Sequence, residues 1–365
     1  MILRAGRDAG AHKFHTRSRK NLQVSAERGL KLVAIGGGTG LSTVLSGLKQ
    51  RVDDRERNGL WLEALSAIVT VSDDGGSSGR LREELQMLPP GDIRNCMVAL
   101  SEDSTLLSRL FQYRFRGEGG LGGHSFGNLF LAALTEVTGD FVEAVRLSSE
   151  VLASKGRIYP ATLNDVRLVA ELEDGREVRG ESRITAARSS VRRLRLEPEQ
   201  CLPLPEALAA IRSADIITVG PGSLYTSILP NLLVARVAEC IGSSRAVKVF
   251  ICNLMTQPGE TDGYTARRHM EVVKSYAPEI GFDFVVVNDR HVSPEQAAAY
   301  AAEGARQIGL TDHLFEEEFG AEAEVVRADL LDEGEKVRHS PEKLARVILS
   351  CYEQACARPA VTAAR

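Results

Sequence analysis

Apolar positions change their spacing several times along the chain, and the first change comes near residue 36. Residues 32–35 are four apolar residues in a row, which leaves no polar face and predicts a fully buried strand. Apolar residues then recur every three or four positions, at Leu41, Val44, Leu45 and Leu48, which predicts a helix. Glycines fill the segment between them. The pattern therefore predicts a strand, a glycine turn and a helix in succession.

The same two patterns alternate through most of the remaining chain. Continuous apolar runs predict strands at residues 65–71, 216–219, 247–252 and 284–287. Three-to-four spacing predicts helices at residues 93–100, 105–111, 125–138, 141–152, 207–211, 232–241, 266–276, 294–305 and 341–351. Asp92 and Ser125 are expected as N-caps, and the Ser-Pro pairs at 293–294 and 340–341 suit an N-cap followed by a first helical residue. This alternation predicts an α/β fold with a mostly parallel sheet and helices on both faces.

One segment departs from this pattern. Residues 166–172 and 177–184 alternate between apolar and polar positions around Asp174-Gly175, a strong hairpin signal, and residues 191–196 alternate as well. We therefore expect a small antiparallel β insertion at about residues 159–198, serving as a lid or an oligomer contact. The predicted organisation is an extension at 1–30, a single domain at 31–350 containing the insertion, and a tail at 351–365.

Composition narrows the class of protein. The 365 residues are 43% hydrophobic and 26% charged with a net charge of −4, so no global basic field indicates a nucleic-acid partner. The six cysteines form no CxxC pair, which is typical of a reducing compartment. No apolar run approaches the ~18 residues of a membrane span, and the chain opens without a signal-peptide apolar region. We expect a cytoplasmic protein. Residues 1–30 are polar and basic, which indicates either a disordered extension or a nucleic-acid arm.

The glycine turn is the first candidate site. Without side chains, a phosphate can approach the main-chain N–H groups, and the helix dipole favours an anion there. The segment matches neither the G-x-G-x-x-G pattern nor a Walker loop, so a different nucleotide or phosphate loop and a turn without any ligand both remain open. The candidate ligand contacts in this turn are Gly36, Gly37, Gly38, Thr39, Gly40 and Ser42.

Polar residues also follow three other predicted strands. In an open parallel sheet the carboxyl ends of the strands share one edge, where ligands bind. Asp73 and Asp74 follow residues 65–71 and could hold Mg²⁺ against a diphosphate, bind ribose hydroxyls, or cap the next turn. The segment 220–227 is either a second anion loop or a proline-glycine turn before a helix cap. The third loop follows the predicted strand at residues 247–252 and begins with Asn253. The candidate ligand contacts in the segment 220–227 and in this third loop are Gly222, Ser223, Thr226 and Asn253.

Four further polar residues are candidates for the same site. His124 is either an acid or phosphate contact or a structural histidine at a helix start, and Asn128 lies one turn on. The guanidinium group of Arg338 could make two parallel hydrogen bonds to a diphosphate, but Arg338 is also interpreted as a surface arginine. Tyr300 is interpreted as a half-buried helix residue. The sequence has no recognisable serine or cysteine nucleophile motif and no histidine pair with metal spacing. Any catalysis should therefore act by positioning and electrostatics on a phosphate group.

Six segments together resemble a known family. They are residues 35–42 (IGGGTGLS), 68–82 (IVTVSDDGGSSGRLR), 89–101 (PPGDIRNCMVALS), 123–141 (GHSFGNLFLAALTEVTGDF), 220–234 (GPGSLYTSILPNLLV) and 252–266 (CNLMTQPGETDGYTA). In this order they resemble the bacterial gluconeogenesis factors, the YvcK-like proteins, which are relatives of the CofD-type 2-phospho-L-lactate transferases. The resemblance runs from about residue 31 to residue 349.

The resemblance implies a Rossmann-like fold and a cytoplasmic regulator that binds UDP-sugars such as UDP-N-acetylglucosamine. Such a regulator would link central carbon metabolism to cell-wall synthesis and cell shape, with regulatory protein partners in cell-wall precursor synthesis, and we expect a homo-oligomer. The transferase relatives imply an alternative, an Mg²⁺-dependent transfer from a nucleotide diphosphate donor. Carried onto this chain, the resemblance implies metal-binding roles for Asp73 and Asp74 and ligand-related positions for Tyr300 and Arg338.

Overall fold

The computed structural model describes residues 28–55, 59–102, 106–309 and 323–358. Its strands are β1 Leu30–Gly36, β2 Leu62–Val69, β3 Arg157–Pro160, β4 Arg167–Leu172, β5 Glu177–Arg179, β6 Val191–Glu197, β7 Ile216–Val219, β8 Val247–Ile251, β9 Phe284–Asn288 and β10 Glu324–Ala328. Its helices are α2 Gly38–Leu48, α3 Gly76–Leu85, α4 Gly91–Leu100, α5 Leu106–Gln112, α6 Phe126–Thr138, α7 Phe141–Val151, α8 Glu181–Ala187, α9 Pro205–Ser213, α10 Leu229–Leu233, α11 Val237–Ser243, α12 Ala266–Tyr276, α13 Pro294–Ala302 and α15 Pro341–Ala357. Two short helical turns are η1 Lys49–Arg51 and η2 Leu224–Ile228.

Seven strands form one sheet in the order β10-β9-β8-β7-β1-β2-β3, and every neighbouring pair is parallel. The chain builds one half of the sheet outward from β1 through β2 to β3. It then returns to β7 on the other side of β1 and builds outward again. The strand order therefore reverses between β1 and β7, which makes this the point where a doubly wound sheet opens a crevice. The predicted α/β fold is confirmed.

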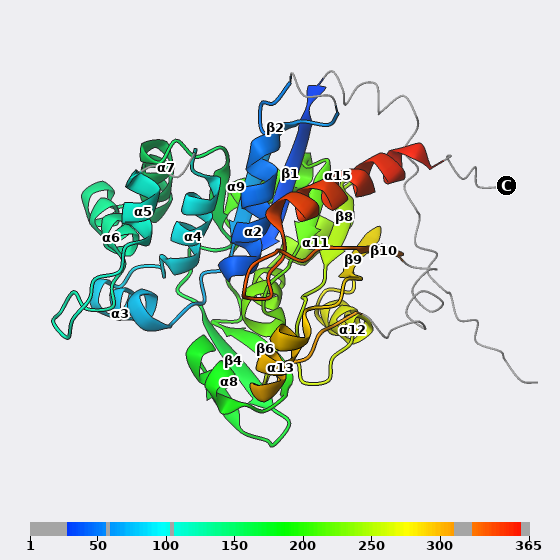
Figure 1. The fold of residues 1–365 in the computed structure, drawn as a ribbon. Helices are drawn as coiled ribbons and strands as arrows, with labels where there is room; N and C mark the ends of the chain where they lie inside the picture. Colours follow the sequence, from blue (N-terminus) through cyan, green and yellow to red (C-terminus); the bar gives the residue numbers. More distant parts are fainter. Residues whose placement is uncertain (1–27, 56–58, 103–105, 310–322, 359–365) are drawn as a thin grey trace, which may run out of the picture.

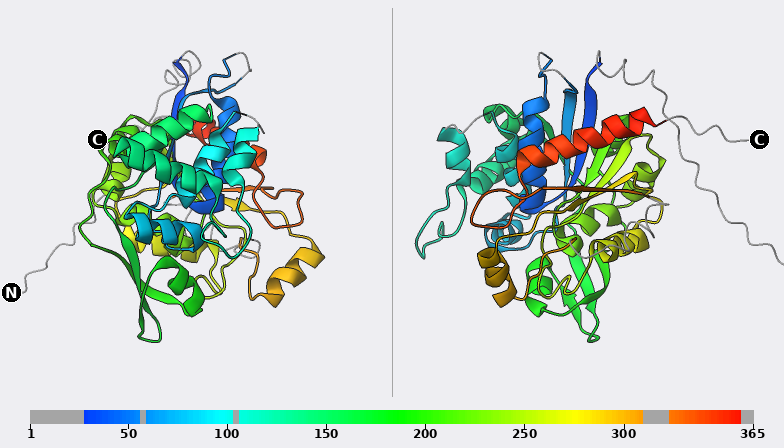
Figure 2. Two further views of the ribbon diagram at one scale, coloured as in Figure 1. Left: turned by 90° about the vertical axis from the view of Figure 1, so that its left-hand side faces the viewer. Right: turned by 45° about the vertical axis from the view of Figure 1, so that its right-hand side comes forward.

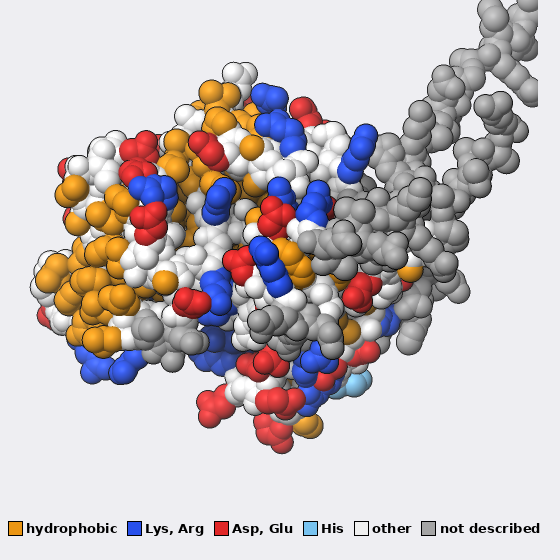
Figure 3. Space-filling model, turned by 90° about the horizontal axis from the view of Figure 1, so that it is seen from above, with side chains coloured by type: hydrophobic (Ala, Val, Ile, Leu, Met, Phe, Trp, Pro, Cys, Tyr) orange, Lys and Arg blue, Asp and Glu red, His pale blue; other side chains and the backbone are white. Residues whose placement is uncertain are grey.

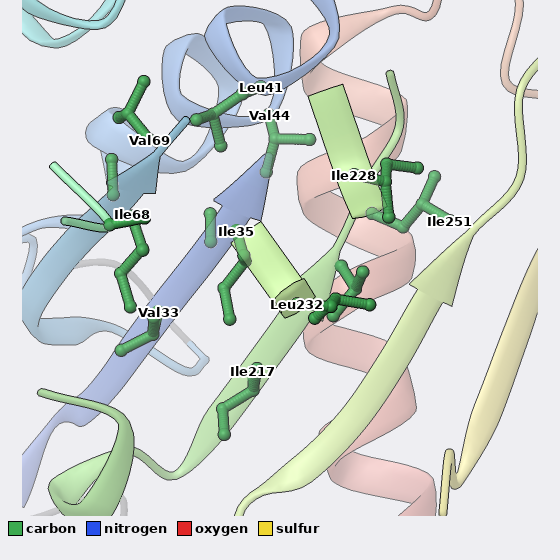
Figure 4. Close-up of a cluster of buried hydrophobic side chains, with 14 of the residues drawn as sticks. Val33, Ile35, Leu41, Val44, Ile68, Val69, Ile217, Ile228, Leu232 and Ile251 are labelled. Carbon is green, nitrogen blue, oxygen red and sulfur yellow. The ribbon is translucent and has the colours of Figure 1, made fainter. Parts of the chain in front are cut away.

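Helices cover both faces of this sheet (Figures 1 and 2). One layer holds α2, α4 and α15, which contact one another or the strands β1, β2 and β8. The other layer holds α9, α10, α11 and α12. Figure 4 shows how α2 is fixed: Leu41 and Val44 point toward Ile35 and Val33 on β1, and all four side chains are buried. Burying this apolar stripe sets the position of the amino-terminal end of α2 at the carboxyl end of β1.

A second sheet has three antiparallel strands in the order β5-β4-β6. It lies with α8 below the carboxyl ends of the large sheet's strands in Figure 1. The predicted insertion is thus present, but two details were wrong. Residues 177–184 are not one strand, because Gly180 has a φ of 98° and α8 follows it. Residues 159–160 belong to β3, which pairs with β2 in the large sheet.

Two other local predictions were wrong. Asp92 is not an N-cap, because α4 begins at Gly91 and Pro90 precedes it, whereas Ser125 does cap α6. Residues 232–241 are not one helix, since Arg236 has a φ of 64° between α10 and α11. The predicted tail from 351 is helical as far as Ala357. Residues 1–27 of the predicted basic extension lie outside the described residues.

Large apolar side chains are exposed over α5 and α6, including Leu106, Leu107 and Val137. Hydrophobic atoms gather over this side of the molecule in Figure 3. The expected homo-oligomer stays a prediction. Among the helices described, none alone has the length and apolarity to cross a membrane. The segments Leu224–Leu233 and Val237–Ser243 reach that length and composition only as a pair, and they bend by 79° where they meet.

Candidate functional site

The loops after β1 and β7 meet where the strand order reverses. A Cβ on Gly40 would come within 2.2 Å of the Pro221 carbonyl oxygen, so the two backbones touch and a side chain has no space there. The Asn231 side chain fixes the same contact, because its Nδ2 donates to the carbonyl oxygens of Gly36 at 3.0 Å and Ser227 at 2.8 Å. The two loops predicted as anion loops therefore form one continuous backbone surface.

The N-cap residue of α2 makes no side-chain hydrogen bond, and the same is true of α3 and α9. Gly37 is the N-cap and supplies no side-chain hydrogen bond, whereas Ser125, Asp140 and Ser340 cap their helices with side-chain oxygens. An uncapped start leaves main-chain N–H groups and the positive end of the dipole for an anion. Ser42, predicted as a ligand contact, donates instead to the Gly38 carbonyl oxygen at 3.0 Å.

One acidic side chain lies against this start of α2. The Asp92 carboxylate accepts a hydrogen bond from the Gly38 N–H, and a Cβ on Gly37 would be 2.7 Å from Asp92 Oδ2. Burial, and then the negative charge of Asp73, raise the pKa of Asp92 to about 6. A carboxylate thus sits at one of the amides that the sequence predicts for a phosphate.

Asp73 and Asp74 have different partners. Asp73 Oδ1 accepts from the Gly75 N–H at 2.9 Å, and Asp73 Oδ2 lies beside Gly91, 2.9 Å from where a Cβ would stand. Asp74 Oδ1 accepts from the Ser182 N–H at 2.9 Å, in the first turn of α8. Asp73 therefore lies beside the start of α4, where its charge acts on Asp92, while Asp74 binds the first turn of α8 in the insertion.

Acidic groups surround this point. Burial, followed by the charges of Asp73, Asp92, Asp74 and Glu260, raises the pKa of Glu181 to about 9, so this carboxyl group is protonated at neutral pH. The excess of carboxylates would repel an anion unless a cation neutralised it. Oxygen donors of this kind suit Mg²⁺, and Asp73 and Asp92 lie close enough for the charge of Asp73 to act on Asp92. In the part of the chain that the structure describes, however, no group of three metal-ligating side chains is assembled.

The loop after β7 is held by hydrogen bonds to the loop after β8. Asn253 contacts Gly222 twice, through Gly222 N to Oδ1 at 2.9 Å and Nδ2 to Gly222 O at 2.7 Å. The Ser223 hydroxyl donates to Glu260 Oε2 at 2.6 Å and accepts from the Thr226 N–H at 3.3 Å. We predicted Ser223 and Thr226 as donors to phosphate. The Ser223 hydroxyl is already used, because Glu260 is almost fully buried and needs a donor.

His124 and Asn128 converge on one serine. Ser77 Oγ lies 2.9 Å from His124 Nδ1 and accepts from Asn128 Nδ2 at 3.0 Å. All three side chains are buried, and burial and nearby arginines lower the pKa of His124, so the ring is neutral at pH 7. These contacts match the structural alternative for His124. The cluster fixes the first turn of α3 beside Asp73.

Arg338 and Tyr300 also lie near the carboxyl edge of the sheet. The ring of His339, next to Arg338, is hydrogen-bonded to the backbone of Cys252, the residue after β8. Arg338 is exposed, and its side chain forms no hydrogen bond or ion pair with the described residues. Tyr300 lies on α13, and the segment after this helix pairs with the loop after β8, where Thr256 N donates to Arg306 O at 2.8 Å. The side chain of Tyr300 is partly buried.

Most of the predicted residues therefore share one edge of the sheet. Gly38 is bonded to Asp92, on which the charge of Asp73 acts, and Gly38 also lies beside Ser227, four residues from Ser223. Asn231 and Glu181 are not among the residues predicted from the sequence. Their roles involve groups distant in the sequence, such as Gly36 for Asn231 and the charge of Asp73 for Glu181, although Asn231 could be suspected as a polar residue within the apolar run 228–234.

Comparisons with known proteins show which family this chain resembles. The sequence model of the family described as 2-phospho-L-lactate transferase CofD matches residues 32–331. The gluconeogenesis factor of Bacillus subtilis is 45% identical over 325 residues, covering 89% of this chain and 98% of the relative. The gluconeogenesis factor of Halalkalibacterium halodurans is 45% identical over 318 residues, covering 87% and 95%.

A solved structure extends the agreement to the fold. The crystal structure of a member of the UPF0052 family from Bacillus halodurans superposes with a TM-score of 0.81 at 44% identity, covering 88% of this chain and 99% of that one. Sequence and structure thus lead to the same group of proteins. This chain belongs to the gluconeogenesis factor family, within the group that the CofD sequence model describes.

Proposed function

We propose that this protein is a cytoplasmic regulator that binds a UDP-sugar, UDP-N-acetylglucosamine, at the crevice between β1 and β7. The main support is the amino-terminal end of α2 at the strand-order reversal, where the N-cap Gly37 supplies no side-chain hydrogen bond, although Asp92 accepts from the Gly38 N–H, and where Gly40 and Pro221 bring two loop backbones together. Main-chain N–H groups at such a helix start suit a diphosphate. The proposed link to cell-wall synthesis and cell shape rests on family membership.

Isothermal titration calorimetry tests this proposal. We expect UDP-N-acetylglucosamine to bind in the micromolar range, about −8 kcal/mol, and uridine to bind far more weakly because it lacks the diphosphate. The affinity for UDP-glucose shows how much the N-acetylglucosamine group contributes to binding, and the affinity for GDP shows whether the site distinguishes the base. Equal affinity for uridine and the UDP-sugars would reject a diphosphate site, and no binding of any uridine ligand would reject the proposed function.

A second candidate function is Mg²⁺-dependent transfer from a nucleotide diphosphate, of the 2-phospho-L-lactate transferase type. The observation that favours it is the group of acidic residues around Glu181, including Asp73 and Asp92, whose negative charge a divalent cation would neutralise. In this case GDP would bind only with Mg²⁺. Asp73→Asn would weaken Mg²⁺-dependent binding more than Asp74→Asn, because Asp74 is bonded to α8. GDP binding that ignores Mg²⁺ would count against this candidate.

A further inference from the structure

Three arginines from different parts of the chain converge on residues 122–125. Arg80 of α3 donates from Nη2 to the Gly122 carbonyl oxygen at 2.6 Å. Arg114, which follows α5, donates from Nη1 to the Gly123 carbonyl oxygen at 2.5 Å. Arg94 of α4 donates from Nη1 to Ser125 Oγ at 2.5 Å. Three guanidinium groups therefore border one four-residue segment.

The three charges are close enough to act on one another. A Cβ on Gly123 would lie 3.3 Å from Arg80 Nη2. Burial, and then the charge of Arg114, lower the pKa of Arg94. Burial, and then the charge of Arg80, lower the pKa of His124, which lies between Gly123 and Ser125. The arginines thus create one region of positive potential.

No carboxylate contacts these arginines. Among the described residues, none of the three forms an ion pair, whereas the neighbouring Arg82 pairs with Asp165. Acidic groups influence the cluster only from a distance: Asp92 and Asp73 act on Arg94, and Glu84 acts on His124. Like charges held together in this way cost free energy unless an anion binds among them.

Two features mark where an anion would bind. Arg94 is 9% exposed, and its Nε is buried without a hydrogen-bond partner. A buried N–H donor without a partner is costly, and an oxyanion that reached Arg94 Nε would supply the missing acceptor. Ser125 is also the N-cap of the 13-residue helix α6, whose dipole adds positive potential at the same point. Arg114 is exposed, Arg80 is half-buried and Arg94 is buried, so a small anion could reach the cluster from solvent at Arg114.

We propose that Arg80, Arg94 and Arg114 form an oxyanion subsite at the start of α6, which binds a phosphate or carboxylate group. Its arginines come from α3, from α4 and from the segment after α5, whereas the glycine turn follows β1. It goes beyond the proposed function, because it does not depend on which nucleotide binds at the crevice. The group is carried either by a separate small anion or by the far end of the nucleotide ligand.

Inorganic phosphate is the probe, and its affinity for the full chain is measured by calorimetry at constant ionic strength. We expect millimolar or tighter binding, weakened about tenfold by Arg114→Gln and by Arg80→Gln, because each removes a charge-assisted hydrogen bond. Arg116→Gln is the matched control. Arg116 is exposed two residues from Arg114 and makes no hydrogen bond or ion pair with described residues, so less than a twofold change is expected. Circular dichroism confirms that each variant is folded.

A titration with saturating UDP-N-acetylglucosamine separates the two sources of the anion. If the phosphate affinity is unchanged, the subsite binds a separate small anion. If phosphate no longer binds, and if Arg114→Gln also weakens the binding of UDP-N-acetylglucosamine, the subsite binds a group of the nucleotide ligand. The subsite is rejected if phosphate does not bind, or if Arg116→Gln weakens it as much as Arg114→Gln. Failure of UDP-sugar binding alone would leave the phosphate result intact and would reject only the proposed function.

Discussion

Most polar side chains at the carboxyl edge of the sheet bind the backbone of a neighbouring loop. Asn253 holds Gly222, Asn231 holds Gly36, and Asp92 accepts from Gly38. These residues therefore position main-chain N–H groups and carbonyls, as expected for a site that recognises a ligand largely through its backbone. Arg338 and Tyr300 are exceptions, because neither side chain has a hydrogen bond to a described residue.

Gly40→Ala tests the close approach of the two loops. The added Cβ would lie 2.2 Å from the Pro221 carbonyl oxygen, so the backbones must separate. We expect the free energy of unfolding to fall by about 1–3 kcal/mol, with weaker UDP-sugar binding. Urea denaturation and calorimetry measure both. Gly281→Ala is the control, because nothing lies within 4 Å of its Cβ position. Equal effects at the two positions would contradict the contact.

Arg338→Ala tests whether a side chain outside the glycine turn contacts the ligand. An arginine paired with a diphosphate contributes a charge-assisted hydrogen bond, so affinity for UDP-N-acetylglucosamine should fall by about 1.5–3 kcal/mol. Arg346→Ala on α15 removes the same charge from an exposed position and should change little. Calorimetry compares the two variants, and unchanged affinity would exclude Arg338 from the site.

His339 predicts how stability depends on pH. Burial lowers its pKa from 6.5 to about 4, so the unfolded chain binds the proton more readily than the folded one between these values. Stability is therefore lost as the pH falls below 6.5, by about 2 kcal/mol between pH 7 and pH 5. Urea denaturation measures the free energy of unfolding of the wild type and of His339→Asn at each pH. The difference between the two proteins removes the contributions of the other titratable groups. An equal loss in both proteins would contradict this origin.

At the scale of elements, sequence periodicity predicted the central strands and missed the edges. The strands β1, β7, β8 and β9 are buried on both faces and therefore read as continuous apolar runs. The edge strand β10 was missed because its residues are exposed or half-buried and its sequence has no such run. The other edge strand, β3, has only four residues, so residues 159–160 were assigned to the insertion.

The insertion is attached to the site by α8. Asp74 accepts from Ser182 N, and Thr185 Oγ1 donates to Glu260 Oε1 at 2.9 Å, while the other Glu260 oxygen accepts from Ser223. The sequence could not predict these contacts, because they join residues 75 to 108 positions apart. Periodicity reports which face of an element is buried, but it does not report which partner covers it.

Thr185→Val tests this attachment. The substitution keeps the shape and removes the donor to Glu260, so α8 should open more easily, by about 1 kcal/mol. Hydrogen exchange of the amides at 181–187 should be several-fold faster. Thr135→Val is the control, because that hydroxyl donates within its own helix, to the Leu131 carbonyl oxygen. Unchanged exchange in α8 would show that the Thr185 contact does not hold it.

At the scale of the molecule, the strand order brings distant loops to one place. The order β3-β2-β1-β7-β8-β9-β10 places the loops after β1 and β7 at the reversal and the loops after β2 and β8 on either side. The alternation of strands and helices was enough to predict this shared edge. It was not enough to predict that the charge of Asp73 acts on Asp92, since the fold alone sets the distance between the loop after β2 and the start of α4.

A crystal structure of the full chain with UDP-N-acetylglucosamine tests the central claim most directly. We predict that the diphosphate lies at the start of α2, within hydrogen-bond distance of main-chain N–H groups in residues 37–40, with the loop 220–227 on its other side. A diphosphate bound elsewhere, for example over α5 or at the opposite edge of the sheet, would contradict the account.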